Sequence, residues 1–160
     1  MRLLGNIEAK VDAKGRVVLP SVFRKSLAAS GEETLVLRKD VFQPCLVLYP
    51  DSVWTEQMDA LRSRLNRWNA AHQQIFRQFV SDVEVMPLDS SGRILLPKRY
   101  LRMAGIEQKV KFIGMGDTIE IWSEANTAKP FLEADDFGKA LEAIMHNAES
   151  DTTGNDGQND

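Results

Sequence analysis

Residues 11–24 read V-D-A-K-G-R-V-V-L-P-S-V-F-R, and residues 88–101 read L-D-S-S-G-R-I-L-L-P-K-R-Y-L. The two stretches lie 77 positions apart, and Asp, Gly, Arg, Leu and Pro recur in both at identical spacing. The apolar positions between them also match in type. Because chance rarely preserves such a pattern over fourteen positions, the chain is expected to contain two copies of one supersecondary unit.

Each copy has the local chemistry of a β-hairpin that leads into a helix. The leading Asp12 or Asp89 can accept a hydrogen bond from a backbone N–H group further along the turn, and Gly15 or Gly92 can adopt a positive φ. Apolar residues then favour a return strand, and the proline that follows suits the first turn of a helix. The predicted turn-shaping residues are therefore Asp12, Gly15, Asp89 and Gly92.

Two further short apolar strands follow each predicted helix, which makes each copy a β-turn-β-α-β-β unit of about 45 residues. A unit of this size can hardly bury its own hydrophobic face. We therefore expect the copies to pack together into one small barrel-like core of an α+β protein.

Between the copies, apolar residues from Trp54 to Trp68 fall at spacings of three and four, which predicts a helical connector that Asn69 can divide in two. Trp54, Trp68 and Trp122 are expected in the core or at a subunit interface. The predicted organisation is a first repeat at 5–51, a helical connector at 52–80, a second repeat at 81–124, a C-terminal helical segment at 125–146 and a disordered acidic tail at 147–160.

Charge is distributed unevenly along the chain. The net charge is −3, but residues 1–114 carry 18 Lys and Arg against 12 Asp and Glu, whereas residues 115–160 carry 2 against 11. Binding of phosphates depends on the local patch rather than on the total, so a basic body can bind nucleic acid in spite of an acidic tail. One cysteine, no signal peptide and no apolar stretch of membrane-spanning length predict a cytoplasmic protein.

The strongest candidate binding residues are Arg16 and Arg93, which follow the turn glycine in both copies. A hairpin turn does not need arginine there, and two-fold packing of the copies would bring both guanidinium groups to one surface. The planar guanidinium suits phosphate oxygens and guanine edges. Nearby basic residues extend this predicted DNA-binding set to Lys14, Arg24, Lys25, Lys98 and Arg99.

Other chemistries find little support in the sequence. His72 and His146 are isolated and lack the spacing of metal ligands, so no metal and no cofactor is expected. The sequence lacks a Ser-His-Asp or Cys-His set, a glycine-rich phosphate loop and a dinucleotide fingerprint, which argues against an enzyme with a small-molecule substrate.

The two D-x-x-G-R-x-x-x-P turns resemble the MraZ family, within the wider AbrB/SpoVT class of swapped-hairpin DNA-binding proteins. The similarity continues over about residues 1–145, through Gly5, the Cys-Leu-Val-Leu-Tyr-Pro run at 45–50, Trp54, Ala104-Gly105-Ile106, Gly114 and Ile121-Trp122.

This resemblance implies a double-split β-barrel with flanking helices, and ring-shaped homo-oligomers, commonly octamers. It also implies a nucleoid-associated repressor that binds short direct repeats in double-stranded DNA upstream of the division and cell-wall gene cluster, including its own gene. The family's Asp-x-x-x-Arg motif corresponds to Asp12 and Arg16, and again to Asp89 and Arg93. Leu101 stands where many members have a second-helix arginine, the counterpart of Arg24, so the first repeat is expected to contribute more to binding.

The sequence leaves two alternatives open. One is an antitoxin-like interaction module, which uses a related fold to neutralise a partner protein, although it usually has one hairpin unit and a long wrapping tail. The other is a purely structural ring. Only a regulator should select short repeats in its own upstream DNA over competitor DNA.

Overall fold

The computed structural model describes residues 1–153, with side chains as far as Asn147. The chain divides into a first unit, Met1–Thr127, and a second unit that begins at Ala128. The first unit contains both copies of the repeated sequence and all of the β-strands of the described residues.

The same order of elements, strand-strand-helix-strand-strand, occurs twice in the first unit. The first set is β1 (Asn6–Lys10), β2 (Arg16–Val18), α1 (Ser21–Ala29), β3 (Thr34–Lys39) and β4 (Leu46–Pro50). The second set is β5 (Glu84–Pro87), β6 (Arg93–Leu95), α4 (Lys98–Met103), β7 (Lys109–Gly114) and β8 (Ile119–Ser123).

The two copies are interleaved, because most neighbouring strands come from different copies. A six-stranded antiparallel sheet has the order β1-β7-β8-β4-β3-β5, and β2 pairs with β6 in a separate two-stranded sheet. If each strand is replaced by its equivalent in the other copy, β1 by β5 and so on, the same order is obtained in reverse. The first unit therefore has an internal two-fold axis, which passes between β4 and β8 and between β2 and β6. The predicted α+β class is confirmed. Within the described residues the ladder does not close into a barrel, because β1 and β5 remain edge strands.

The main core lies between the sheets and the two short helices. Phe23 and Leu27 of α1, Tyr100 of α4 and Phe112 of β7 are fully buried in it. Val17 and Ile94 reach the same core from β2 and β6. Side chains from both copies thus fill one core, as expected for units that are too small to fold alone.

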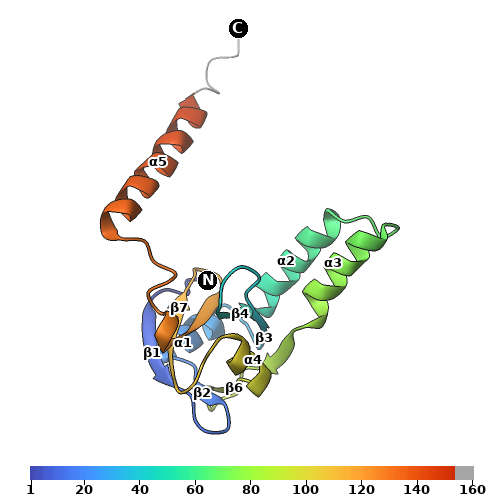
Figure 1. The fold of residues 1–160 in the computed structure, drawn as a ribbon, viewed down its shortest axis with the longest axis vertical. Helices are drawn as coiled ribbons and strands as arrows, with labels where there is room; N and C mark the ends of the chain where they lie inside the picture. Colours follow the sequence, from blue (N-terminus) through green and yellow to red (C-terminus); the bar gives the residue numbers. More distant parts are fainter. Residues whose placement is uncertain (154–160) are drawn as a thin grey trace. The chain divides into compact units, whose positions relative to one another are not determined.

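The connector forms a helical hairpin of α2 (Asp51–Ser63) and α3 (Ala70–Ser81), which projects from the sheet of the first unit (Figure 1). Asn69 begins α3, and its side chain accepts hydrogen bonds from the N–H groups of Ala71 and His72. Trp54 stacks on Phe79 at 5.1 Å in a second apolar cluster. Trp68 was expected in the core or at a subunit interface, and the core is wrong for it: Trp68 is 96% exposed near the tip of the hairpin, so the interface stays a prediction.

A short 3₁₀ helix (Glu124–Asn126) ends the second copy, and the second unit contains helix α5 (Ala134–Thr153). The disordered tail predicted from residue 147 is thus wrong for residues 147–153, which continue α5, while 154–160 lie outside the described residues. None of the helices described is both long and apolar enough to span a lipid bilayer.

Candidate nucleic-acid interface

The two-stranded sheet of β2 and β6 presents both candidate arginines on one face. Arg16 lies opposite Leu95, Val17 opposite Ile94, and Val18 opposite Arg93. Residues directly opposite, and residues two apart on one strand, share a face of the sheet. Val17 and Ile94 are buried, whereas the residues on either side of them are exposed. Arg16 and Arg93 therefore occupy diagonal corners of the same outer face.

Reciprocal hydrogen bonds fix this pairing at both ends. The N–H of Leu19 donates to the carbonyl of Gly92 at 2.8 Å, and the N–H of Leu96 donates to the carbonyl of Gly15 at 2.8 Å. Each turn is therefore held by the strand of the other copy. This exchange makes the spacing of the two arginines a property of the whole first unit rather than of either hairpin.

In the first turn, the carboxylate of Asp12 organises both the backbone and the arginine. Its Oδ1 accepts the N–H groups of Lys14 and Arg16, each at 2.9 Å, and its Oδ2 accepts the Nε–H of Arg16 at 3.0 Å. The hydrogen bond from the Arg16 backbone, followed by those from its side chain and from Lys14, lowers the pKa of Asp12. The bidentate face of the guanidinium, made by its two terminal nitrogens, is left for an external acceptor.

The second turn has a different hydrogen-bond arrangement. Asp89 accepts the hydroxyl of Ser91 at 2.5 Å and its backbone N–H at 3.0 Å, and these bonds lower the pKa of Asp89. The N–H of Arg93 donates to the Ser91 hydroxyl at 3.3 Å rather than to the carboxylate. The side chain of Arg16 is thus tethered to its turn aspartate, whereas Asp89 binds the neighbouring serine.

Both turn glycines have positive φ, +87° at Gly15 and +69° at Gly92, but they face different neighbours. A Cβ on Gly15 would lie 2.5 Å from the carbonyl oxygen of Leu96, whereas a Cβ on Gly92 would meet the side chain of Arg24 at 2.7 Å. The Nε of Arg24 donates to the carbonyl of Leu19 at 2.9 Å. The predicted binding residue Arg24 thus lies half-buried across the second turn. The second turn has Ser91 where the first has Lys14, so Arg24 supplies the positive charge near the second turn.

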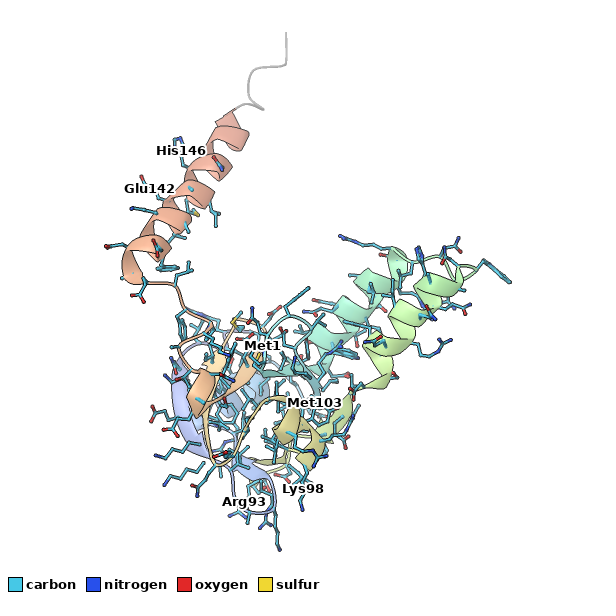
Figure 2. All side chains as sticks on the ribbon, viewed as in Figure 1. Met1, Arg93, Lys98, Met103, Glu142 and His146 are labelled. Carbon is cyan, nitrogen blue, oxygen red and sulfur yellow. The ribbon has the colours of Figure 1, made fainter. Side chains whose placement is uncertain are left out.

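The other predicted basic residues divide into two groups. Lys14, Lys25 and Lys98 are exposed, and Figure 2 shows Arg93 and Lys98 towards the same end of the first unit in this view. Arg99, by contrast, is engaged within the protein: its Nη1 lies 2.5 Å from Oδ1 of Asp82, and its Nη2 donates to the Tyr100 hydroxyl at 2.9 Å. Its guanidinium therefore has internal partners that a nucleic acid would have to replace.

The structure adds one basic residue that the sequence reasoning did not select. A shallow hollow between the two arginines is lined by Arg16, Arg93, Asp12 and Lys10, with the two valines of β2. Lys10 is the last residue of β1, immediately before the turn. The alternation of polar and apolar residues in the sequence N-I-E-A-K was the available signal, and the structure places Lys10 among the exposed residues of this strand.

Features that would indicate other chemistry are weak. No group of three or more His, Cys, Asp or Glu residues in the described part of the chain is placed to hold a metal ion. Cys45 is fully buried, and desolvation raises the pKa of its thiol, which disfavours a reactive thiolate. His72 accepts a hydrogen bond from the N–H of Asn66 at 2.8 Å through Nδ1, a local contact of the helical hairpin.

The fold and this surface define a class of protein: two interleaved hairpin-and-helix repeats that display a pair of arginines on a small antiparallel ribbon. The sequence profile described as "MraZ protein, putative antitoxin-like" matches residues 3–78 and 79–137. The chain belongs to the MraZ family.

Similar proteins are each named "Transcriptional regulator MraZ". The relative from Phocaeicola vulgatus is 66% identical over 145 residues, which cover 91% of this chain and 94% of the relative. The relative from Bacteroides fragilis is 58% identical over 156 residues, 98% of each chain. A more distant relative, from Christiangramia forsetii, is 34% identical over 94% of this chain and 97% of its own.

Proposed function

We propose that this protein is a sequence-specific DNA-binding transcriptional regulator rather than an enzyme, acting in the cytoplasm at the nucleoid. Relatives that match nearly the whole chain are named transcriptional regulators. The observation that carries the DNA-binding part is the shared outer face of β2 and β6, from which Arg16 and Arg93 project.

A two-stranded ribbon has the dimensions to enter the major groove of B-DNA, which is about 12 Å wide. An arginine there can donate two hydrogen bonds to one guanine, worth about 1–3 kcal/mol of discrimination, or bind phosphate oxygens. Asp12 restricts the orientation of Arg16 through its Nε, which lowers the entropy lost on binding. The ribbon therefore reads DNA with Arg16 and Arg93, supported by the exposed Lys14, Lys25 and Lys98.

One ribbon alone would bind weakly, because it reaches few phosphates. Useful affinity requires several copies of the protein on one DNA, and short direct repeats in the operator would provide sites for them. We propose a ring-shaped homo-oligomer, an octamer, whose protomers each interleave their two repeats with the double-split topology that the family resemblance implies, the sheet of each protomer remaining open at β1 and β5. Its target is the division and cell-wall gene cluster that includes its own gene, and its effect is repression.

A binding assay on full-length protein tests the proposal. Fluorescence anisotropy with DNA from the chain's own upstream region is expected to show preference over unrelated competitor DNA. Arg16→Ala and Arg93→Ala should each weaken specific binding by about 10- to 100-fold, the loss of one good base contact. Arg64→Ala removes an exposed arginine from the helical hairpin and serves as the matched control. Equal binding of the operator and of competitor DNA would refute a sequence-specific regulator.

The asymmetry of the two turns gives this test a second readout. Arg16 has the neighbouring Lys14 and the tether to Asp12, so Arg16→Ala is expected to cause the larger loss. Comparable losses for Arg16→Ala and Arg93→Ala would show that the two repeats contribute equally.

The family description also names an antitoxin-like protein, which makes a protein-binding module the second candidate. Such a module would not distinguish its upstream DNA from competitor DNA, and substitutions of Arg16 and Arg93 would leave DNA affinity unchanged.

A further inference from the structure

A pair of lysines faces one another across the β1–β7 ladder. Lys10 lies directly opposite Lys109, and both side chains are exposed. Like charges in this position destabilise a sheet. Glu124 offsets part of the repulsion, since one of its carboxylate oxygens lies 3.8 Å from Nζ of Lys109.

The position equivalent to this pair in the other copy carries no charge. The internal two-fold relates the β1–β7 ladder to the β5–β3 ladder, where Pro87 lies opposite Thr34. The repeated architecture therefore does not require lysines here. The lysine pair occurs in only one of the two equivalent ladders, which indicates that it serves a purpose other than folding.

Lys10 belongs to two adjoining hollows, which connects this pair to the ribbon. One hollow contains Lys10 together with Arg16 and Arg93. The other contains Lys10 together with Lys109 and Lys111, and also with the acidic Glu8 and Glu124. Lys10 thus lines both the hollow of the paired arginines and the hollow that contains Lys109.

We propose that Lys10 and Lys109 form a phosphate-binding site that holds the DNA backbone beside the ribbon, a role that rests on the proposed DNA-binding function. A phosphate between the two ammonium groups would relieve their repulsion. Because this repulsion destabilises the free protein, its relief adds to the affinity for DNA. Lys111 contributes less, because Glu8 lies directly opposite it. Contacts to phosphate position the DNA without reading its sequence.

The test is the salt dependence of binding by the full-length Lys10→Ala/Lys109→Ala variant. Each phosphate contact contributes about 0.9 to the slope of log affinity against log salt. The slope of the variant should therefore be smaller by about 1.8. If the variant and the wild-type protein have the same affinity near 1 M salt, this difference makes the variant bind about 60-fold more weakly at 0.1 M salt. The loss should be the same for operator and for unrelated DNA.

Two further variants complete the experiment. Lys129→Ala/Lys139→Ala removes the same charge from exposed positions of the second unit and should leave the slope unchanged. Glu124→Gln removes the acid beside Lys109 and should tighten binding. Lys10→Gln/Lys109→Gln keeps long polar side chains and repeats the test if the alanine variant folds poorly.

The possible results separate this proposal from the one on which it rests. If the Arg16 and Arg93 variants bind DNA more weakly than the wild-type protein but the lysine variants keep the wild-type slope, the phosphate site is wrong and the regulator stands. A loss equal to that of the control variant, or a loss confined to operator DNA, also overturns the phosphate site. A wild-type protein without DNA affinity overturns both proposals.

Discussion

At the scale of single residues, the two turn glycines show how similar motifs acquire different constraints. Gly15 and Gly92 occupy equivalent positions, yet Gly15 abuts the backbone of Leu96 and Gly92 abuts the flexible side chain of Arg24. The carbonyl of Leu96 belongs to backbone that the N–H of Leu96 anchors on the carbonyl of Gly15, so it cannot easily move aside, whereas an arginine side chain can change its rotamer. The two hairpins should therefore differ in their tolerance of a methyl group.

Gly15→Ala is expected to lower the free energy of unfolding by about 2–4 kcal/mol, from the positive φ and from overpacking against Leu96. Gly116→Ala is the matched control, because its φ of +86° is nearly that of Gly15 but no described atom lies within 4 Å of its Cβ position. It should lose only about 1–2 kcal/mol. Urea unfolding of the three proteins measures both values, and equal losses would mean that the Leu96 carbonyl moves freely.

At the scale of elements, the helical hairpin depends on a local capping interaction and on one packed cluster. Asn69 provides the cap of α3. Packing of α3 on the sheet involves the Arg38 guanidinium, which lies 4.6 Å from the centre of the Phe79 ring and donates to the Phe79 carbonyl at 3.1 Å. The buried side of the hairpin is therefore fixed near the sheet, while its tip depends on the cap.

Asn69→Ala is expected to lower the free energy of unfolding by about 1 kcal/mol, because two N–H groups at the start of α3 lose their acceptor. Asn69→Asp should keep most of that stability, since a carboxylate accepts the same hydrogen bonds. Thermal unfolding of the full chain compares them. An alanine variant as stable as the wild type would show that water satisfies the exposed N–H groups equally well.

At the scale of the whole molecule, the proposed regulator works through several copies on one operator. Two linked sites bind more tightly than one by about 10²- to 10⁴-fold when both can be engaged at once. Adding a second repeat to a DNA that carries one should therefore raise the affinity within that range. The geometry of the assembly, rather than the single ribbon, would set the required distance between the repeats.

Insertion of about 5 base pairs between two repeats turns the second repeat to the opposite side of the duplex, since a helical turn is about 10.5 base pairs. This insertion should abolish the gain, and insertion of a full turn should restore part of it. Anisotropy titrations at fixed salt measure the three affinities. Affinity that does not change with the number or phase of the repeats would contradict binding by a rigid oligomer.

Strands, turns and helix ends were predictable wherever adjacent residues determine them. Asp12 and Asp89 accept backbone N–H groups within their own turns, and Asn69 caps the helix that follows it. The end of α5 was not predictable in the same way. Residues 147–153 have little apolar content, and the local pattern gave no sign that the helix continues to Thr153.

The sequence by itself determined the duplicated hairpin and the presence of an arginine after each turn, because both depend on residues only a few positions apart. Tertiary structure alone decided that β1 pairs with β7 and β2 with β6, which brings Lys10, Arg16 and Arg93 to one hollow. It also decided that Arg99 is paired with Asp82, 17 positions earlier in the chain. Strand partners and ion pairs of this kind depend on long-range packing, which local preferences do not encode.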